Sequence, residues 1–173
     1  LGVSTATLTT ALFKRGLRNT AIDGVRPLNQ TASRMAGPAF TLRYIPARED
    51  LDTLKVFEDP RHPQRHAVET IPAGRVMVID SRKDARAASA GGILVRRMMV
   101  RGAAGIVTDG GLRDSAEIAA MGFPAFCQAP SAPTNLARHH AVDIDVPIGC
   151  GDVPVYPGDW IVGDAEAVVV VPA

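Results

Sequence analysis

Two short apolar runs separated by a helix-length segment constrain the fold of this chain more than any other feature. Residues 75–80 (RVMVID) and 104–108 (AGIVT) are typical of buried strands, and residues 91–102 predict a helix before the second run. A strand–helix–strand order predicts two parallel strands joined by a crossover. Ligands of such sheets bind beyond the carboxyl ends of the strands, which is where the sequence places Asp80 and Asp109.

Further β structure is predicted on both sides of this centre. From Val142 onward, short apolar runs alternate with glycine, aspartate and proline, which is typical of antiparallel hairpins with Asp159 and Asp164 in their turns. The other expected elements are a helix over 4–16, a strand over 38–45, a charged surface excursion over 46–66 with one short helix, a helix after residue 114 that ends at 122, and a strand over 123–127.

The fold class that follows is α/β, with a β-α-β centre and an antiparallel β layer supplied mainly by the C-terminal third. A length of 173 residues suffices for one domain of typical size, so we expect a single domain over residues 1–173. Because the chain stops directly after the apolar run Val168–Val171, we also expect a C-terminal tail to be missing.

Charge and cysteine content exclude several function classes. The net charge is +1 and the basic residues are scattered, so we expect no direct contact with nucleic acid. Cys127 and Cys150 have no neighbouring cysteine or histidine at metal-site spacing, which indicates reduced thiols in a cytoplasmic protein. No apolar run reaches the roughly 18 residues of a membrane span, so we expect no membrane partner.

The strongest candidate site joins the segment Gly91–Leu94 (GGIL) to the pair Arg113-Asp114. A helix that opens with two glycines lets a ligand approach its backbone N–H groups, and these groups favour an anion. Twenty residues separate Gly92 from Arg113, so one helix and one strand would return the chain to the same sheet edge. An arginine can grip a carboxylate and an aspartate can bind Mg²⁺ or Mn²⁺. The sequence therefore predicts a small anionic substrate held beside a metal ion.

Each of these signals also has a purely structural interpretation. A glycine pair can form a tight turn, and an Arg-Asp pair can be a surface salt bridge. Glu117 follows Asp114 by three residues, so it is either a second acidic group of the site or a charge on a helix surface.

Two further groups of residues resemble sites but are better explained structurally. Cys127 follows an apolar run and has no local base, which favours a buried structural thiol over a nucleophile. His139, His140 and Asp143 suggest a metal site, but neighbouring histidines on a helix point about 100° apart. We therefore expect a surface helix end at these two histidines.

Several motifs, taken in this order, resemble the RraA-like family. They are GGIL at 91–94, RGAAGIVTDGGLRD at 101–114, GFPAF at 122–126 and GDVPVYPGDWIVGD at 151–164. That family includes the regulator of ribonuclease E activity and the metal-dependent 4-hydroxy-4-methyl-2-oxoglutarate/4-carboxy-4-hydroxy-2-oxoadipate aldolases. The resemblance implies a swivelling β/β/α domain that assembles as a homotrimer, or as paired trimers in a hexamer, with sites at subunit interfaces.

The resemblance also implies roles for the candidate residues. Arg113 and Asp114 would be the catalytic pair, with Arg113 on the substrate carboxylate and Asp114 on Mg²⁺ or Mn²⁺. The metal would polarise the 2-oxo group as the carbon–carbon bond breaks. The implied substrate-binding residues, which would cradle pyruvate or its enolate, are Gly91, Gly92, Ile93, Leu94 and Arg113.

One position departs from the aldolase pattern, and it leaves three functions open. The residue that opens the 20-residue gap is acidic in the aldolases but is Gly92 here, while Glu117 remains as a second candidate metal ligand. The first function is a divalent-metal-dependent lyase, an aldolase or oxaloacetate decarboxylase, that cleaves a small 2-oxo dicarboxylic acid to pyruvate. The second is a non-catalytic regulator that binds and inhibits a ribonuclease. The third is a sibling enzyme that acts on sugar-acid-derived 2-oxo acids.

Overall fold

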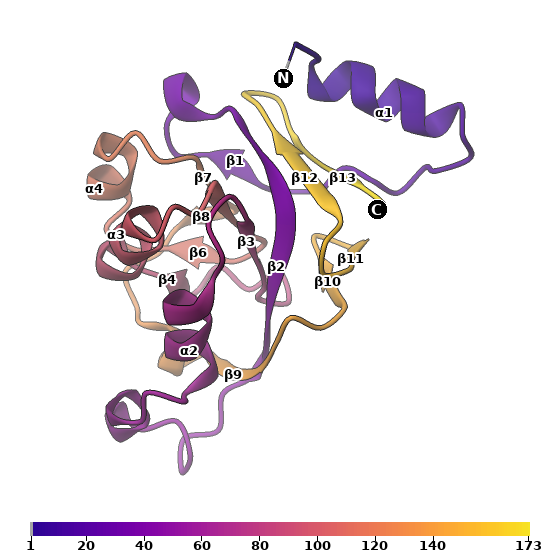
Figure 1. The fold of residues 1–173 in the computed structure, drawn as a ribbon. Coiled ribbons are helices and arrows are strands. Elements are labelled where there is room, and N and C mark those ends of the chain that lie inside the picture. Colours follow the sequence, from indigo (N-terminus) through magenta and orange to yellow (C-terminus); the bar gives the residue numbers. More distant parts are fainter. Residues whose placement is uncertain (1) are drawn as a thin grey trace.

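A single long strand, β2 (Met35–Pro46), connects the two halves of the molecule (Figure 1). It pairs with the parallel strand β3 (Val76–Asp80) along its middle, with the antiparallel strand β12 (Trp160–Gly163) at its start and with the antiparallel strand β9 (His139–Ile144) at its end. The predicted strand over 38–45 is therefore confirmed, but it is longer at both ends. The computed structural model describes residues 2–173.

The predicted β-α-β centre is confirmed. Strand β3 lies parallel to β5 (Gly105–Thr108), and the helix α3 (Gly92–Val100) precedes β5 in the chain. The sheet continues from β5 to the parallel strand β7 (Ala125–Cys127). The order β1-β7-β5-β3-β2-β12-β13, with β9 also paired to β2, makes one eight-stranded mixed sheet and confirms the α/β fold class.

The remaining elements surround this sheet. They are α1 (Thr5–Phe13), β1 (Arg26–Pro27), η1 (Gln30–Ala32), η2 (Leu54–Glu58), α2 (Pro63–Thr70), β4 (Ala88–Ala90), β6 (Gly111–Leu112), α4 (Ser115–Ala120), β8 (Ala129–Pro130), η3 (Asn135–Ala137), β10 (Ile148–Cys150), β11 (Val153–Val155) and β13 (Val168–Val171). Strands β4, β6 and β8 form a small parallel sheet that the sequence did not reveal, because runs of two or three residues carry no readable periodicity.

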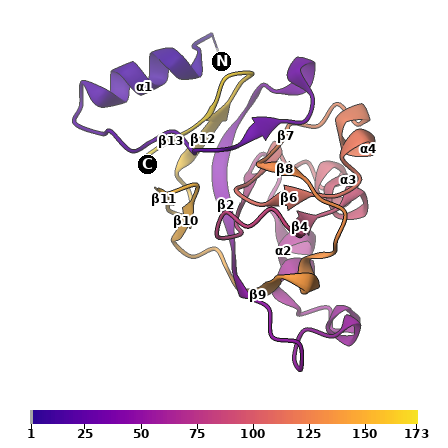
Figure 2. The ribbon, with the colours of Figure 1, turned by 180° about the vertical axis from the view of Figure 1, so that it is seen from behind.

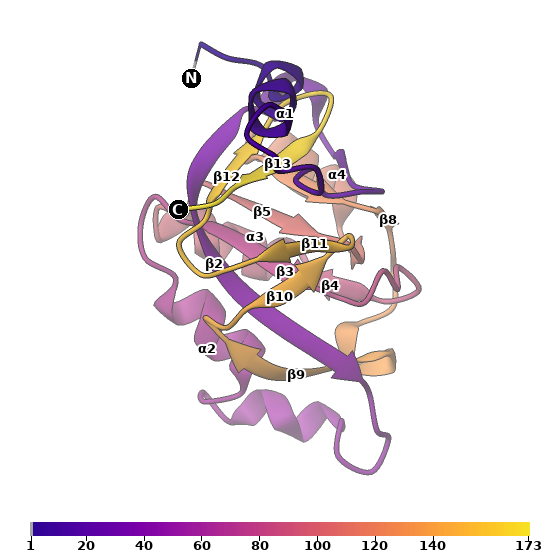
Figure 3. The same cartoon turned by 90° about the vertical axis from the view of Figure 1, so that its right-hand side faces the viewer.

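The main sheet has an apolar core on each face, and the alternation of side chains along β3 explains both. Met77 and Ile79 point toward helices α2, α3 and α4, where they pack with residues such as Met98. Val76 and Val78 point to the opposite face, toward the hairpins β10–β11 and β12–β13. Figure 3 shows the β10–β11 hairpin lying across β2 and β3 on that face. The predicted C-terminal hairpins are therefore confirmed.

Helix α1 stands apart from the main body and lies against β13, as the two opposite views show (Figures 1 and 2). Its first residue is held by a long-range contact, because the N–H and the hydroxyl of Thr5 both donate to the Asp164 carboxylate at 2.8 Å. Asp164 also accepts from the N–H of Glu166 at 2.9 Å, which confirms it as a turn residue. Asp159 accepts from the N–H of Tyr156 in the same way. None of the helices within residues 2–173 is long and apolar enough to cross a membrane.

Candidate functional site

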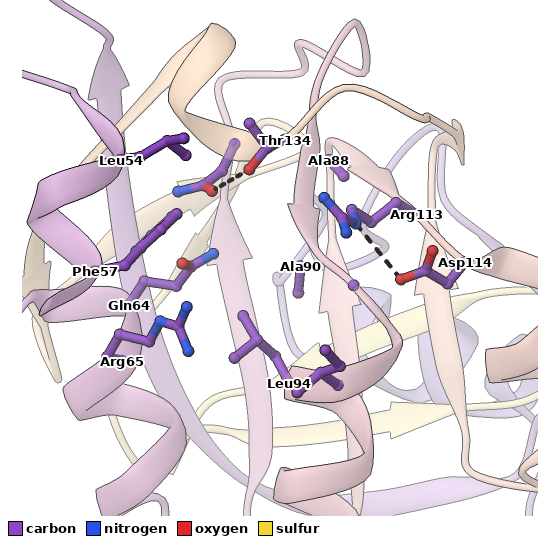
Figure 4. Close-up of a pocket in the computed structure, with 13 residues that line it drawn as sticks. Leu54, Phe57, Gln64, Arg65, Ala88, Ala90, Leu94, Arg113, Asp114 and Thr134 are labelled. Carbon is purple, nitrogen blue, oxygen red and sulfur yellow. Dashed lines mark hydrogen bonds and ion pairs between the residues drawn. The ribbon is translucent and has the colours of Figure 1, made fainter. Parts of the chain in front are cut away.

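The two predicted motifs meet at one pocket of about 350 Å³ (Figure 4). Gly91 follows β4 and Arg113 follows β6, so both lie at the carboxyl ends of parallel strands, as predicted. The sheet that brings them together is the small β4-β6-β8 sheet, however, and not the main one. The pocket is lined by Leu54, Phe57, Gln64, Arg65, Ala88, Ala90, Gly91, Ile93, Leu94, Arg113, Asp114, Thr134 and Asn135.

Asp80 and Asp109, which the sequence placed at the crevice, do not line this pocket. Asp109 is buried, and its carboxylate accepts from the backbone N–H groups of Ser81 at 2.6 Å and Gly151 at 3.1 Å. Burial raises the pKa of Asp109, and these N–H groups oppose that rise. Asp109 therefore joins loops beneath the sheet edge and does not face a ligand.

The glycine pair matters because of the space it leaves. Gly91 has an extended backbone, which any residue can adopt, but a Cβ there would lie 2.7 Å from the Arg113 Cγ and 2.9 Å from the Asp114 Oδ2. A Cβ on Gly92 would lie 3.1 Å from the Glu117 Oε2 and 3.3 Å from the Asp114 Cβ. The missing side chains therefore let Arg113, Asp114 and Glu117 approach the start of α3.

Asp114 links two helices at the site. Its Oδ2 accepts the backbone N–H of Gly92 at 2.9 Å, so it caps α3 from outside that helix, at the end where the helix dipole favours a negative charge. Its own backbone is left-handed, with φ 58° and ψ 35°, directly before α4. Such conformations in a residue other than glycine cost of order 1 kcal/mol and cluster at functional sites.

Arg113 presents its guanidinium to the pocket. Its backbone N–H donates to Ala90 O at 3.1 Å, which fixes the turn after β6, and its Nε lies 3.5 Å from the Asp114 Oδ2. The side chains of Arg113 and Asp114 are 43% and 40% exposed, so both remain accessible to a ligand. Arg113 and Asp114 therefore form a salt bridge and also line the pocket. The structural interpretation of this pair does not exclude a binding role.

The carboxylates of Asp114 and Glu117 converge on Gly92, and this pair suits a magnesium-type ion. No group of three or more histidine, cysteine, aspartate or glutamate side chains within residues 2–173 could hold a metal. Mg²⁺, however, commonly binds through one or two carboxylates and takes its other ligands from water and substrate. Glu117 lies beside the space that an acidic side chain at position 92 would enter. The residues present therefore fit such an ion.

The opposite wall of the pocket contains polar residues that sequence reasoning missed. Gln64 and Arg65 come from α2, and Thr134 lies directly before η3 (Figure 4). Asn135 is the first residue of η3. Gln64 is buried, and its Nε2 donates to the Tyr44 Oη at 3.0 Å. The only available signal was a glutamine on the apolar face of a short helix.

Nearly the whole chain, and not only these motifs, matches a known family. A profile of the RraA-like family, described as Aldolase/RraA, covers residues 5–170. The chain belongs to the RraA-like family.

Proteins similar to this RraA-like chain include one named as an aldolase and one from a family of RNase inhibitors. A Halalkalibacterium halodurans protein named "Putative 4-hydroxy-4-methyl-2-oxoglutarate aldolase" is 36% identical over 152 residues. The alignment covers 86% of this chain but only 64% of that relative. Streptomyces coelicolor RraAS2, described as an unusual member of the RNase ES inhibitor RraA family, has a TM-score of 0.86 at 31% identity over 99% of this chain and 81% of its own.

A second solved structure, less similar to this chain, has the same fold. The RNA-processing inhibitor RraA from Thermus thermophilis has a TM-score of 0.72 at 25% identity over 99% of this chain and 94% of its own. The RraA-like fold is thus shared over nearly all of the chain.

The structure corrects the expectation of a surface helix end at His139 and His140. Both lie in strand β9, because this segment pairs with the end of β2. His139 is fully buried and stacks on Tyr44 with 5.4 Å between ring centroids, and burial lowers its pKa. His140 pairs with Asp52, and Asp143 pairs with Arg43. These residues do not form a metal site in the RraA-like chain.

Cys127 is a buried thiol, as expected. Its side chain is 2% exposed, and burial raises its pKa to about 11. A thiol that stays protonated at neutral pH is a poor nucleophile. Cys150 is also buried and free, and burial raises its pKa too.

Proposed function

We propose that this chain is a divalent-metal-dependent carbon–carbon lyase that releases pyruvate from a small 2-oxo dicarboxylic acid. One observation carries the proposal: the side chains of Arg113, Asp114 and Glu117 converge on the start of α3, where Arg113 and Asp114 also line the pocket. The name of the Halalkalibacterium halodurans relative supports the same reaction class.

The start of α3 and Arg113 supply the carboxylate site. The first N–H groups of a helix have no partner inside it, and the first turn of α3 closes with Val95 donating to Gly91 O. Asp114 takes the N–H of Gly92, so the groups offered to a ligand are those of Ile93 and Leu94. With the Arg113 guanidinium opposite, they bind the carboxylate next to the 2-oxo group.

The same groups stabilise the charge that develops during cleavage. As the bond between C3 and C4 breaks, negative charge grows on the pyruvate fragment, and Arg113 and the helix dipole are already oriented toward it. Asp114 and Glu117 would hold Mg²⁺ or Mn²⁺ at Gly92. The chemistry that such an ion supplies when bound is polarisation of the 2-oxo group.

Pyruvate release tests this function directly. Purified protein with Mg²⁺ or Mn²⁺ should release pyruvate from oxaloacetate or from 4-hydroxy-4-methyl-2-oxoglutarate faster than a metal-only blank, in an assay coupled to NADH oxidation. Arg113→Ala should remove the activity, whereas Arg96→Ala, on the exposed side of α3, should not. No release above the blank from either substrate, or full activity in Arg113→Ala, would refute the proposal.

Two alternative functions remain, and particular observations favour the first of them. Gly92 lacks the acidic side chain of the aldolases, and two similar structures are described as ribonuclease or RNA-processing inhibitors, which favours a non-catalytic ribonuclease regulator as the second candidate. A sibling lyase for sugar-acid-derived 2-oxo acids is the third. A panel of 2-oxo acids separates the third from the first, and inhibition of a purified ribonuclease without pyruvate release would establish the second.

The family resemblance also implies a homotrimer or hexamer. Two apolar side chains at the pocket, Leu54 and Ile93, are 74% and 81% exposed, which supports an interface near the site. Light scattering should give three or six times the chain mass of 18.2 kDa. A monomer at all concentrations would refute this expectation.

A further inference from the structure

We propose that Arg65 and Asn135 form a second subsite that binds the distal carboxylate of the substrate and makes the pocket selective for dicarboxylic 2-oxo acids. This inference rests on the proposed function for the end of the pocket at Arg113. The subsite lies on the pocket wall formed by α2 and η3. The proposed function gives no role to the residues of this wall.

Arg65 enters the pocket from the side opposite Arg113 (Figure 4). It extends from α2, and its guanidinium lies over the Phe57 ring, 4.7 Å from the centroid. Its Nε is buried and has no hydrogen-bond partner in the part of the chain that the structure describes. None of the carboxylates there forms an ion pair with Arg65, whereas Arg61, four residues earlier and outside α2, pairs with Asp59. A cation held in this way is available for an anionic ligand.

Asn135 offers a second unsatisfied donor to the same pocket. The residue is 4% exposed, and its Oδ1 accepts from the Thr134 hydroxyl at 3.1 Å. Its Nδ2 is buried and finds no partner within residues 2–173. Buried amide donors are almost always hydrogen-bonded, so an unpaired one that lines a pocket indicates a ligand acceptor.

The residues that line the pocket between Arg65 and Arg113 indicate which class of ligand fits. Ala90 and Leu94 lie between Arg65 and Arg113, so the middle of the pocket is apolar (Figure 4). A volume of about 350 Å³ is at the lower end of the range for small-molecule pockets, about 300–1,000 Å³. A compact diacid with a short aliphatic middle matches this arrangement better than a neutral or polyhydroxylated chain.

Calorimetric binding of two probes tests the subsite. Oxalate occupies only the end at Arg113, whereas 2-oxoglutarate also carries a distal carboxylate; both are titrated into the full chain with Mn²⁺. Arg65→Gln should weaken 2-oxoglutarate about 10- to 100-fold, as expected for a lost charge-assisted contact, and change oxalate by less than about twofold. Arg65→Lys should recover part of the loss, and Arg61→Gln is the matched control.

A second variant and the oxalate probe keep the test independent of folding. Asn135→Asp places a like charge at the distal carboxylate and should also weaken 2-oxoglutarate selectively. Equal 2-oxoglutarate affinity in the parent and in Arg65→Gln would overturn the subsite and leave the proposed function standing. If the parent binds 2-oxoglutarate in an Arg65-dependent way but does not bind oxalate, the proposed carboxylate site at Arg113 is overturned and the subsite stands. Failure to bind either probe would overturn both.

Discussion

Replacing Gly91 by alanine should lower activity about 100-fold with little effect on folding. The extended backbone of Gly91 accepts any residue, so the whole effect comes from the added methyl group. That methyl would lie 2.7 Å from the Arg113 Cγ and 2.9 Å from the Asp114 Oδ2, whereas ordinary contacts begin at 3.4 Å. The Arg113 side chain must therefore move by about 0.7 Å, the difference between 3.4 Å and 2.7 Å. A misplacement near 1 Å in a catalytic group can cost about 100-fold in rate.

The stability cost of this substitution should be small because the displaced side chains have room to move. Arg113 and Asp114 are 43% and 40% exposed, so they can relax toward solvent. What remains is the poorer helix start, since alanine is a worse N-cap than glycine, at a cost of up to about 1 kcal/mol. For a chain of this size, that lowers the melting temperature by about 2–4 °C.

Two measurements on Gly91→Ala separate these effects. Pyruvate release should fall about 100-fold, while thermal unfolding followed by circular dichroism should shift by no more than about 4 °C. Gly149→Ala is the matched control, because Gly149 is an exposed β-strand glycine with no atom within 4 Å of an added Cβ. If Gly91→Ala kept parental activity, the close approach of Arg113 and Asp114 to α3 would not position the site, and the reasoning would fail.

Three further predictions concern charge and burial. Asp114→Asn should weaken Mn²⁺ binding at least tenfold in calorimetry yet melt close to the parent, because asparagine still accepts the Gly92 N–H and tolerates a left-handed backbone; parental Mn²⁺ affinity would contradict the assignment. Burial lowers the pKa of His139, so the unfolded chain binds its proton first as pH falls. Stability present above pH 6.5 should therefore be lost below it, and His139→Phe should reduce this slope in scanning calorimetry; a parental melting temperature that is flat from pH 7.5 to 5 would argue against it. Since burial raises the pKa of Cys127 to about 11, a thiol reagent at about pH 8 should label it only after unfolding; rapid labelling of the folded protein would show that it is accessible.

The parts of the fold, and the meeting of the two motifs, that the sequence predicted correctly depend on local patterns. The run at residues 75–80 alternates between two cores, and β3 does so in the structure. The spacing between Gly92 and the Arg113-Asp114 pair predicted that the two motifs meet, because a crossover returns the chain to the same sheet edge. The structure therefore places the two motifs together, as their spacing in the sequence predicted.

The parts that the sequence missed depend on contacts between distant segments. Arg65 and Asn135 lie 70 positions apart, and only the packing of α2 and η3 brings them to one pocket. The sequence predicted a surface helix end at His139 and His140, whereas pairing with the end of β2 places both in strand β9. Strands of two or three residues, such as β6, arise from their neighbours alone.

The length of β2 has a consequence for how this protein acquires its structure during synthesis. Residues near its start, such as Pro38, pair with Trp160, more than a hundred positions later in the chain. Sheets closed by such distant partners form slowly, because a long loop must be ordered before its contacts are gained. During synthesis, the start of β2 therefore has no partner on one edge until β12 has left the ribosome. During that interval β2 exposes the edge opposite β3, and an unpaired strand edge of this kind can pair with another chain.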